Sequence, residues 1–125
     1  MIDFIKVNFY DEKIPACIPH KPEYDLLARI FESTVRMPYY YSLSKELHEI
    51  LAGERIELEK REHLDPQENT VPSSDPSSYI ILKVKNNMVI IEDLERNEIM
   101  DLDIITFTQY VDDWIKFVEN IEKEH

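Results

Sequence analysis

In the C-terminal third of the chain, the spacing of apolar residues changes from every second residue, as in a strand, to about every 3.6 residues, as in a helix. This change constrains the fold more than any other feature. Two β-rich runs, 79–85 and 88–94, flank Asn86-Asn87, and asparagines tolerate the positive φ angles of a two-residue hairpin turn. A turn at 95–97 and a short strand at 98–102 follow. After them, apolar residues recur at the i, i+3, i+4, i+7 spacing of an amphipathic helix. Its expected buried stripe is Phe107, Tyr110, Val111, Trp114, Val118 and Ile121.

The N-terminal half predicts one strand and two helices. Apolar and polar residues alternate over 4–10, which is typical of a strand with one buried face. We expect the proline-rich piece 14–22 to be an extended connection. Apolar residues at helical spacing predict one helix over 22–35 and another over 43–52.

Capping residues indicate where the helices begin and end. Met37-Pro38 is expected to end the first helix, because a residue before proline disfavours the helical conformation. Ser42 is the expected N-cap of the second helix. Gly53, the only glycine, stands where a left-handed residue ends a helix. Thr106 and Gln109 have the Thr-x-x-Gln spacing of a capping box for the last helix.

The remaining residues complete the expected architecture. Residues 55–61 alternate as in an edge strand or a hairpin arm, whereas 62–77, rich in proline and serine, predict a long loop. Hairpins outnumber crossovers in this order, which favours antiparallel pairing. The expected fold class is α+β: a mostly antiparallel sheet of about four to five strands, two N-terminal helices and one C-terminal amphipathic helix. A chain of 125 residues is expected to form a single domain over 1–125.

Composition excludes several function classes. A single glycine rules out glycine-rich phosphate loops, and a formal net charge of -12 argues against nucleic-acid binding, which needs Lys and Arg. No apolar run has the length of a membrane span, about 18 residues, and the N-terminal residues lack the pattern of a secretory signal. One cysteine excludes an intramolecular disulfide. We therefore expect a cytoplasmic protein that binds neither nucleic acid nor membrane.

The residues predict no catalytic group, no metal ligands and no cofactor. The four histidines are scattered and lack the spacing of a metal site. Cys17 and His20 are the only thiol–imidazole candidate, and a small buried hydrophobe is the simpler interpretation of Cys17. Paired carboxylates are abundant in so acidic a chain, so a small carboxylate-based enzyme remains an alternative.

The acidic residues crowd toward the C-terminus. Residues 92–125 hold eleven of the 26 acidic residues and three of the 14 basic ones. A concentrated negative surface attracts a basic partner and speeds the encounter. We therefore expect partner contacts at Glu92, Asp93, Glu95, Glu98, Asp101 and Asp103.

Three consecutive tyrosines, Tyr39, Tyr40 and Tyr41, follow Met37-Pro38 in the expected connection between two helices. All three cannot face a core from one short connection, so at least one is expected to be exposed. Tyrosine anchors many protein interfaces, and the three are therefore candidate aromatic contacts, with core-edge packing as the alternative.

The C-terminal third resembles the end of small bacterial immunity proteins. The resemblance lies in the run Met88–Asp93 and in Ile105–Ile115, read as Ile-Thr-Phe-Thr-Gln-Tyr-Val-Asp-Asp-Trp-Ile. It is similar to the closing strands and Ser/Thr-Phe-x-x-Phe/Tyr-Leu/Val helix of the SUKH superfamily, and to immunity proteins of contact-dependent inhibition systems. The resemblance implies a cytoplasmic antitoxin without catalytic activity that binds one cognate toxin. Many such toxins are nucleases with basic clefts, which an acidic inhibitor would occupy in place of the phosphate backbone.

The first functional hypothesis is therefore an immunity protein that blocks a toxin, of nuclease type, through its acidic surface. The second is a non-catalytic adaptor or regulatory subunit that docks a peptide or protein in an apolar groove or at the loop 62–77. The carboxylate-based enzyme is the third.

Overall fold

A computed structural model describes residues 1–32, 37–64 and 78–123. The expected loop at 62–77 therefore lies outside the described residues from 65 onward, and residues 62–64 are the end of a strand. The order of elements is β1 (Ile2–Phe9), β2 (Glu12–Pro19), η1 (Pro22–Tyr24), α1 (Asp25–Phe31), α2 (Met37–Leu51), β3 (Leu58–Leu64), β4 (Ser78–Lys85), β5 (Met88–Asp93), β6 (Glu98–Asp103) and α3 (Ile104–Lys123).

The strands form two antiparallel sheets, whereas we expected one. β3, β4, β5 and β6 form a four-stranded sheet in sequence order, and β1 pairs with β2 in a separate hairpin. The α+β class and the antiparallel pairing are confirmed. The expected single sheet is wrong, because the piece 14–22 is not a mere connection: most of it is strand β2.

The prolines of β2 are the reason that this segment was predicted to be a connection and not a strand. Pro15 lies opposite Lys6 and Pro19 opposite Ile2, at positions where the missing N–H would point away from β1, so neither proline costs a hydrogen bond of the pair. The turn Tyr10-Asp11 is also unusual, since both residues have positive φ angles without the Asn-Gly sequence that announces such turns. At Asn86-Asn87 the expected two-residue turn is confirmed, with both φ angles positive.

The helix boundaries differ from the expected ones at three places. The first predicted helix, 22–35, is a 3-10 turn over Pro22–Tyr24 followed by α1, which ends at Phe31 with Glu32 as its C-cap and not at Met37-Pro38. α2 begins at Met37 rather than after Ser42, because a proline is tolerated in the first turn of a helix, so the three tyrosines lie in this helix. Its end is as expected. Gly53 has a φ of 80°, and the N–H groups of Gly53 and Glu54 donate to the carbonyls of Ile50 and Glu49, which is the Schellman arrangement.

The start of α3 is set by Asp103 and not by a Thr106–Gln109 capping box. The carboxylate of Asp103 accepts a 2.9 Å bond from the N–H of Thr106 and a 2.7 Å bond from its hydroxyl. Gln109 instead donates to Asp113. The expected stripe of α3 is confirmed, with Trp114 fully buried and Tyr110 partly buried against the core.

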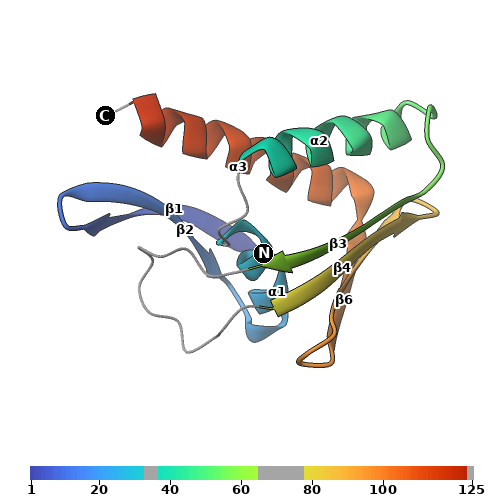
Figure 1. Cartoon of the computed structure of the whole chain (residues 1–125), viewed down its shortest axis with the longest axis horizontal. Helices are drawn as coiled ribbons and strands as arrows, with labels where there is room; N and C mark the ends of the chain where they lie inside the picture. The colour runs from blue at the N-terminus through green and yellow to red at the C-terminus, as the bar shows by residue number, and fades with distance from the viewer. Residues whose placement is uncertain (33–36, 65–77, 124–125) are drawn as a thin grey trace.

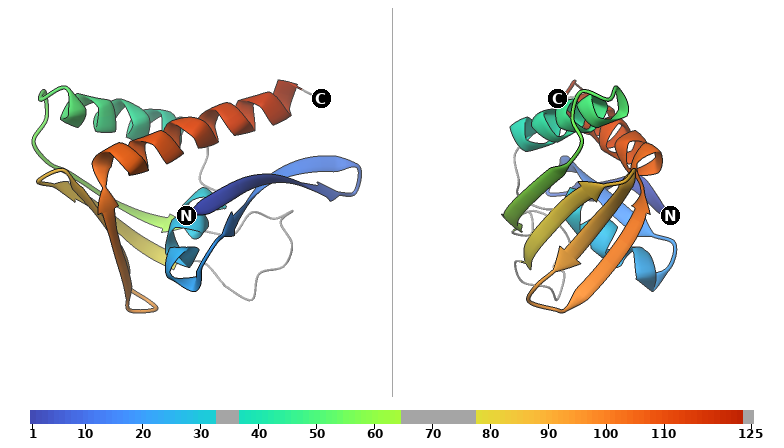
Figure 2. Two further views of the ribbon diagram at one scale, coloured as in Figure 1. Left: turned by 180° about the vertical axis from the view of Figure 1, so that it is seen from behind. Right: turned by 90° about the vertical axis from the view of Figure 1, so that its right-hand side faces the viewer.

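Helices cover one face of the four-stranded sheet, and no helix of the described residues lies on the opposite face, where Ile81 is nevertheless buried. α2 and α3 run side by side in opposite directions above the sheet, and the hairpin and α1 lie at one end (Figure 1). In the right-hand view of Figure 2 the sheet lies in front of α1 and the hairpin. We call the helix-covered side, which carries Leu82, Val89 and Ile91, the closed face, and the opposite side the open face.

Candidate functional site

Strand alternation divides five of the six predicted acidic contacts between the two faces of the sheet, and the sixth, Glu95, lies in the turn between β5 and β6. Successive side chains of a strand point to opposite faces. Asp93 pairs with Glu98 on the closed face, whereas Glu92 pairs with Ile99 on the open face. The expectation that these carboxylates form one continuous surface is therefore wrong.

The two carboxylates of the closed face, Asp93 and Glu98, bind Arg29 of α1. The Arg29 guanidinium donates to Asp93 at 2.9 Å and to Glu98 at 2.6 Å. The other oxygen of Asp93 accepts from the backbone N–H groups of Glu95 and Arg96. Asp93 is 1% exposed and all of these contacts are internal, so its carboxylate belongs to the fold and is not carried into the proposed interface.

Three carboxylates remain together on the open face, and we call them the acidic sheet face: Glu92, Asp101 and Asp103. Asp101 lies opposite Ile90 and Asp103 opposite Met88, so the three occupy adjacent positions of two paired strands. Ile99, 67% exposed, stands beside them. Within the described part of the chain, neither Glu92 nor Asp101 has an ion-pair partner.

Asp103 combines this position with its capping role. The backbone N–H and the hydroxyl of Thr106 hold the pKa of the Asp103 carboxyl below its usual value, so the group is ionised at neutral pH. Glu95 is exposed in the turn between β5 and β6, at the edge of the acidic sheet face.

The other half of the open face carries both signs of charge. Lys83 and Lys85 of β4 and Arg61 of β3 lie on it with Glu57 and Glu59, at separations of 3.7 to 4.0 Å. Such exposed pairs contribute little to stability, but they neutralise this half. The unpaired negative charge of the open face is therefore on β5 and β6.

The predicted tyrosines lie in the helical layer, away from the acidic sheet face. Tyr40 is buried, its hydroxyl donating to the carbonyl of Ile30 at 2.7 Å. Tyr39 is partly buried, and the ammonium of Lys60 lies 5.2 Å from its ring centroid. Tyr41 is exposed, as expected of at least one of the three; desolvation and the neighbouring Glu119 raise the pKa of its hydroxyl. Of the three tyrosines, Tyr41 is thus the exposed one, and its role as a partner contact stays a prediction.

The thiol–imidazole candidate does not form. Cys17 is buried, and that burial, with the nearby Glu32 carboxylate, raises the pKa of the thiol far above its usual value. His20 instead lies 2.9 Å from the carboxylate of Asp3. In the described ranges, no three His, Cys, Asp or Glu side chains gather as metal ligands would.

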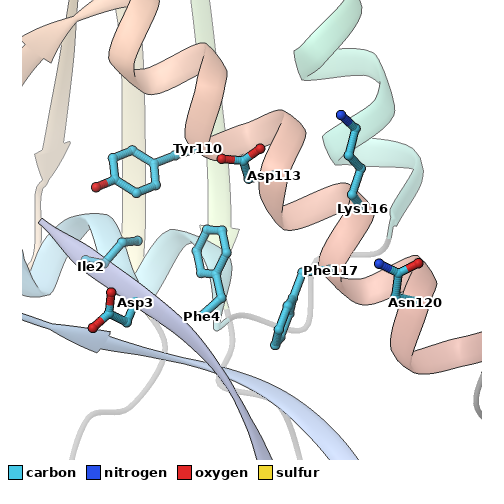
Figure 3. Close-up of a pocket in the computed structure, with 8 residues that line it drawn as sticks. All are labelled: Ile2, Asp3, Phe4, Tyr110, Asp113, Lys116, Phe117 and Asn120. Atoms are coloured by element: carbon cyan, nitrogen blue, oxygen red, sulfur yellow. The ribbon is translucent and has the colours of Figure 1, made fainter.

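A groove that the sequence did not reveal runs between β1 and α3, and we call it the α3 groove. Its main hollow, about 460 Å³, is drawn in Figure 3. β1 contributes Ile2, Asp3 and Phe4, and α3 contributes Tyr110, Asp113, Lys116, Phe117 and Asn120. Tyr110 and Asp113 also line a second hollow of about 420 Å³ at the start of α3. The sequence signal that could have indicated this groove is the pair of aromatic residues Tyr110 and Phe117 on α3.

Comparison of the chain with protein-family models, curated proteins and solved structures finds no match. The resemblance to immunity proteins thus stays an expectation. No helix among the described residues has an apolar stretch of the length needed to traverse a bilayer.

Proposed function

We propose that this protein is a non-catalytic binding protein, an immunity protein that blocks a toxin by covering a basic surface of it. The observation that carries this proposal is the acidic sheet face: Glu92, Asp101 and Asp103, which have no ion-pair partner among the described residues, lie beside the exposed Ile99 on the open face of the sheet.

This arrangement has the anatomy of a protein interface. Interfaces combine an apolar centre with a polar, charged rim. Here Ile99 and the half-buried Ile90 supply the apolar part, and the carboxylates of Glu92 and Asp101 flank them on the two strands. The negative charge of this rim would attract a toxin cleft lined by Lys and Arg, and the bound sheet would then block access to that cleft.

The rigidity of the surface favours a preformed mode of binding. β5 and β6 are inner and edge strands of a four-stranded ladder, and the turn between them is held by Asp93. Little conformational entropy would be lost at this surface on binding, because its backbone is already ordered.

The experiment compares toxin neutralisation by the wild-type chain and two charge variants. The partner to test is the product of the gene next to the one for this chain: its expression alone should stop growth, and co-expression of the wild-type chain should restore it. Glu92→Gln with Asp101→Asn should lower the association rate constant about tenfold at low salt. Glu12→Gln with Glu23→Gln, which removes the same charge from exposed sites elsewhere, should change it less than twofold.

Salt provides the second measurement. The wild-type association rate should fall steeply between 0.01 and 0.3 M salt, concentrations over which the Debye length falls from about 30 Å to below 10 Å. A wild-type chain that does not protect cells, or two charge variants with equal rates, would refute the proposed function.

A further inference from the structure

The hydrogen-bond phase of the β5–β6 ladder determines which backbone groups of β6 point outward. The N–H of Ile104 donates to the carbonyl of Asn87 at 3.0 Å, and this pair continues the register of the two strands. Hydrogen-bonded pairs of an antiparallel ladder recur at every second residue. The even-numbered residues of β6 therefore bond to β5, and the N–H and C=O groups of Ile99 and Asp101 point away from the sheet.

These outward groups lie on an exposed strand edge. β6 is the last strand of the four-stranded sheet, and the right-hand view of Figure 2 shows it in orange along the margin of that sheet. Ile99 and Asp101 are both exposed. Within residues 1–32, 37–64 and 78–123, their outward backbone groups have no hydrogen-bond partner. The edge thus offers two donors and two acceptors, and no proline interrupts it.

The hairpin that ends in β6 is strongly negative. Met88–Asp103 holds six acidic residues and one basic residue, Arg96. Arg29 brings a second cation to the closed face, where it is bound by Asp93 and Glu98. The hairpin therefore keeps an excess of negative charge after both of these cations are counted.

The excess lies on the open face, beside the edge. Asp101 has no ion-pair partner in the part of the chain that the structure describes. The lysines of this face, Lys83 and Lys85, belong to β4, two strands away, and they pair with Glu59 and Glu57. Cations placed next to β6 would therefore meet a carboxylate that no other side chain neutralises.

We propose that the outer edge of β6 pairs with an extended segment of the partner protein, and that alternate residues of this segment are Lys or Arg. Main-chain bonds to Ile99 and Asp101 would supply affinity, and the alternate side chains would supply specificity. Those on the open face would lie beside Asp101, where opposite charges on neighbouring strands attract. The proposal deepens the proposed function, on which the identity of the partner rests.

A second copy of this chain is the other candidate for a strand edge. Two copies paired through β6 would bring their Asp101 carboxylates onto the same face. Each copy also carries a net charge of -12, and like charges oppose association. The basic segment is therefore the occupant to which the charge of the hairpin is complementary.

The test uses the full chain and two labelled nine-residue peptides, one alternating Lys and Val and the other alternating Glu and Val. The Lys peptide should bind with a Kd below about 1 mM, and the Glu peptide should bind far more weakly. Bound Lys peptide should slow hydrogen exchange at the amides of Ile99 and Asp101 about tenfold. The amide of Met100 should exchange slowly throughout, because it bonds to β5. Equal binding of the two peptides, or unchanged exchange at Ile99 and Asp101, would overturn the proposal.

Backbone methylation separates strand pairing from charge attraction. In an antiparallel added strand the amides that face β6 belong to the residues on the open face, which are the lysines; in a parallel strand they belong to the valines. Of two Lys peptides, one N-methylated at two central Lys and one at two central Val, one should lose affinity about tenfold. The weakened peptide reports the strand direction. Equal affinities for the two would contradict strand pairing.

Two variants at one position test the outward N–H of β6. Ile99→Pro removes this N–H without removing a bond to β5, and proline is tolerated at such positions of an edge strand. Ile99→Ala removes the side chain and keeps the N–H, so it should bind the Lys peptide about fivefold more tightly than Ile99→Pro. The fluorescence of Trp114 checks that both variants are folded. Equal binding by the two would contradict the proposed backbone contact.

The charge of the edge has its own pair of variants. Asp101→Asn keeps the backbone and removes one charge, so it should weaken the Lys peptide about threefold. Glu12→Gln removes one charge from an exposed position of the β1–β2 hairpin and should leave the affinity unchanged. Equal affinities for these two variants would refute the selection of a basic segment.

The outcomes distinguish this inference from the proposed function. A chain that does not neutralise the toxin, yet shows the peptide protection at Ile99 and Asp101, refutes the proposed function alone. A chain that neutralises the toxin without that protection refutes this inference alone. A wild-type dimer in sedimentation that Ile99→Pro dissociates would show that a second copy, and not a basic segment, occupies the edge.

Discussion

The Arg29 guanidinium donates a 2.9 Å hydrogen bond to the buried carboxylate of Asp93 and thereby joins α1 to the β5–β6 hairpin. The same carboxylate holds the turn that follows it, through the N–H groups of Glu95 and Arg96. One buried side chain therefore sets both the hairpin turn and its position against the helix.

Removal of this carboxylate should be strongly destabilising. We expect Asp93→Ala to lower the free energy of unfolding by about 3–5 kcal/mol, because it removes the buried carboxylate that pairs with the mostly buried Arg29 and that holds the following turn. Glu98→Gln alters the more exposed contact of the same arginine and should cost below about 1 kcal/mol. Urea unfolding followed by circular dichroism measures both, and similar losses for the two variants would contradict the role assigned to Asp93.

Thr108 offers a stabilising substitution. Its hydroxyl is buried and has no hydrogen-bond partner among the described residues, and an unsatisfied buried polar group is costly. Thr108→Val keeps the shape and should raise the free energy of unfolding by about 1 kcal/mol. Thr106→Val, the matched control on the same helix, should destabilise, because the Thr106 hydroxyl donates to Asp103. Thermal unfolding of the two variants should show midpoints displaced in opposite directions.

The cap of α3 should make stability depend on pH. In the folded state, the hydrogen bonds from Thr106 lower the pKa of the Asp103 carboxyl. The carboxylate therefore makes its full contribution to the free energy of unfolding above the pKa that Asp103 has in the unfolded chain. This contribution is lost as the pH falls through the lower pKa of the folded protein. Asp103→Ala should therefore reduce the unfolding midpoint at pH 7, and the difference from wild type should shrink below about pH 4. A difference that is constant from pH 7 to pH 3 would show that the charge of Asp103 is not involved.

Cys17 should be unreactive in the folded protein. Burial raises the pKa of its thiol, and the thiolate is the nucleophile. Ellman's reagent at pH 8 should modify it only as fast as the protein opens, and at once in urea. The raised pKa also predicts that the free energy of unfolding decreases above about pH 9, because the thiol then ionises in the unfolded chain but stays protonated in the folded protein. Rapid labelling of the native protein would contradict the burial of Cys17.

The candidate acidic site illustrates the limit of reasoning from charge along the chain. Crowding of acids near the C-terminus is visible in the sequence, but Glu92 and Asp93 are neighbours in sequence and lie on opposite faces of the sheet. Which of the two faces the solvent depends on where the helices pack. The same holds for Tyr40 and Tyr41, where the turn of α2 buries one and exposes the other.

Local patterns by themselves determined the elements whose cause is local: the α3 stripe around Trp114, the Asn86-Asn87 turn and the glycine that ends α2. Backbone conformation and periodic burial decide these within a few residues. Only the tertiary structure decided the second sheet, the use of Asp93 as an internal anchor and the groove beside β1. Each of these requires groups far apart in the chain to meet, and the energy of those contacts leaves no short-range pattern in the sequence.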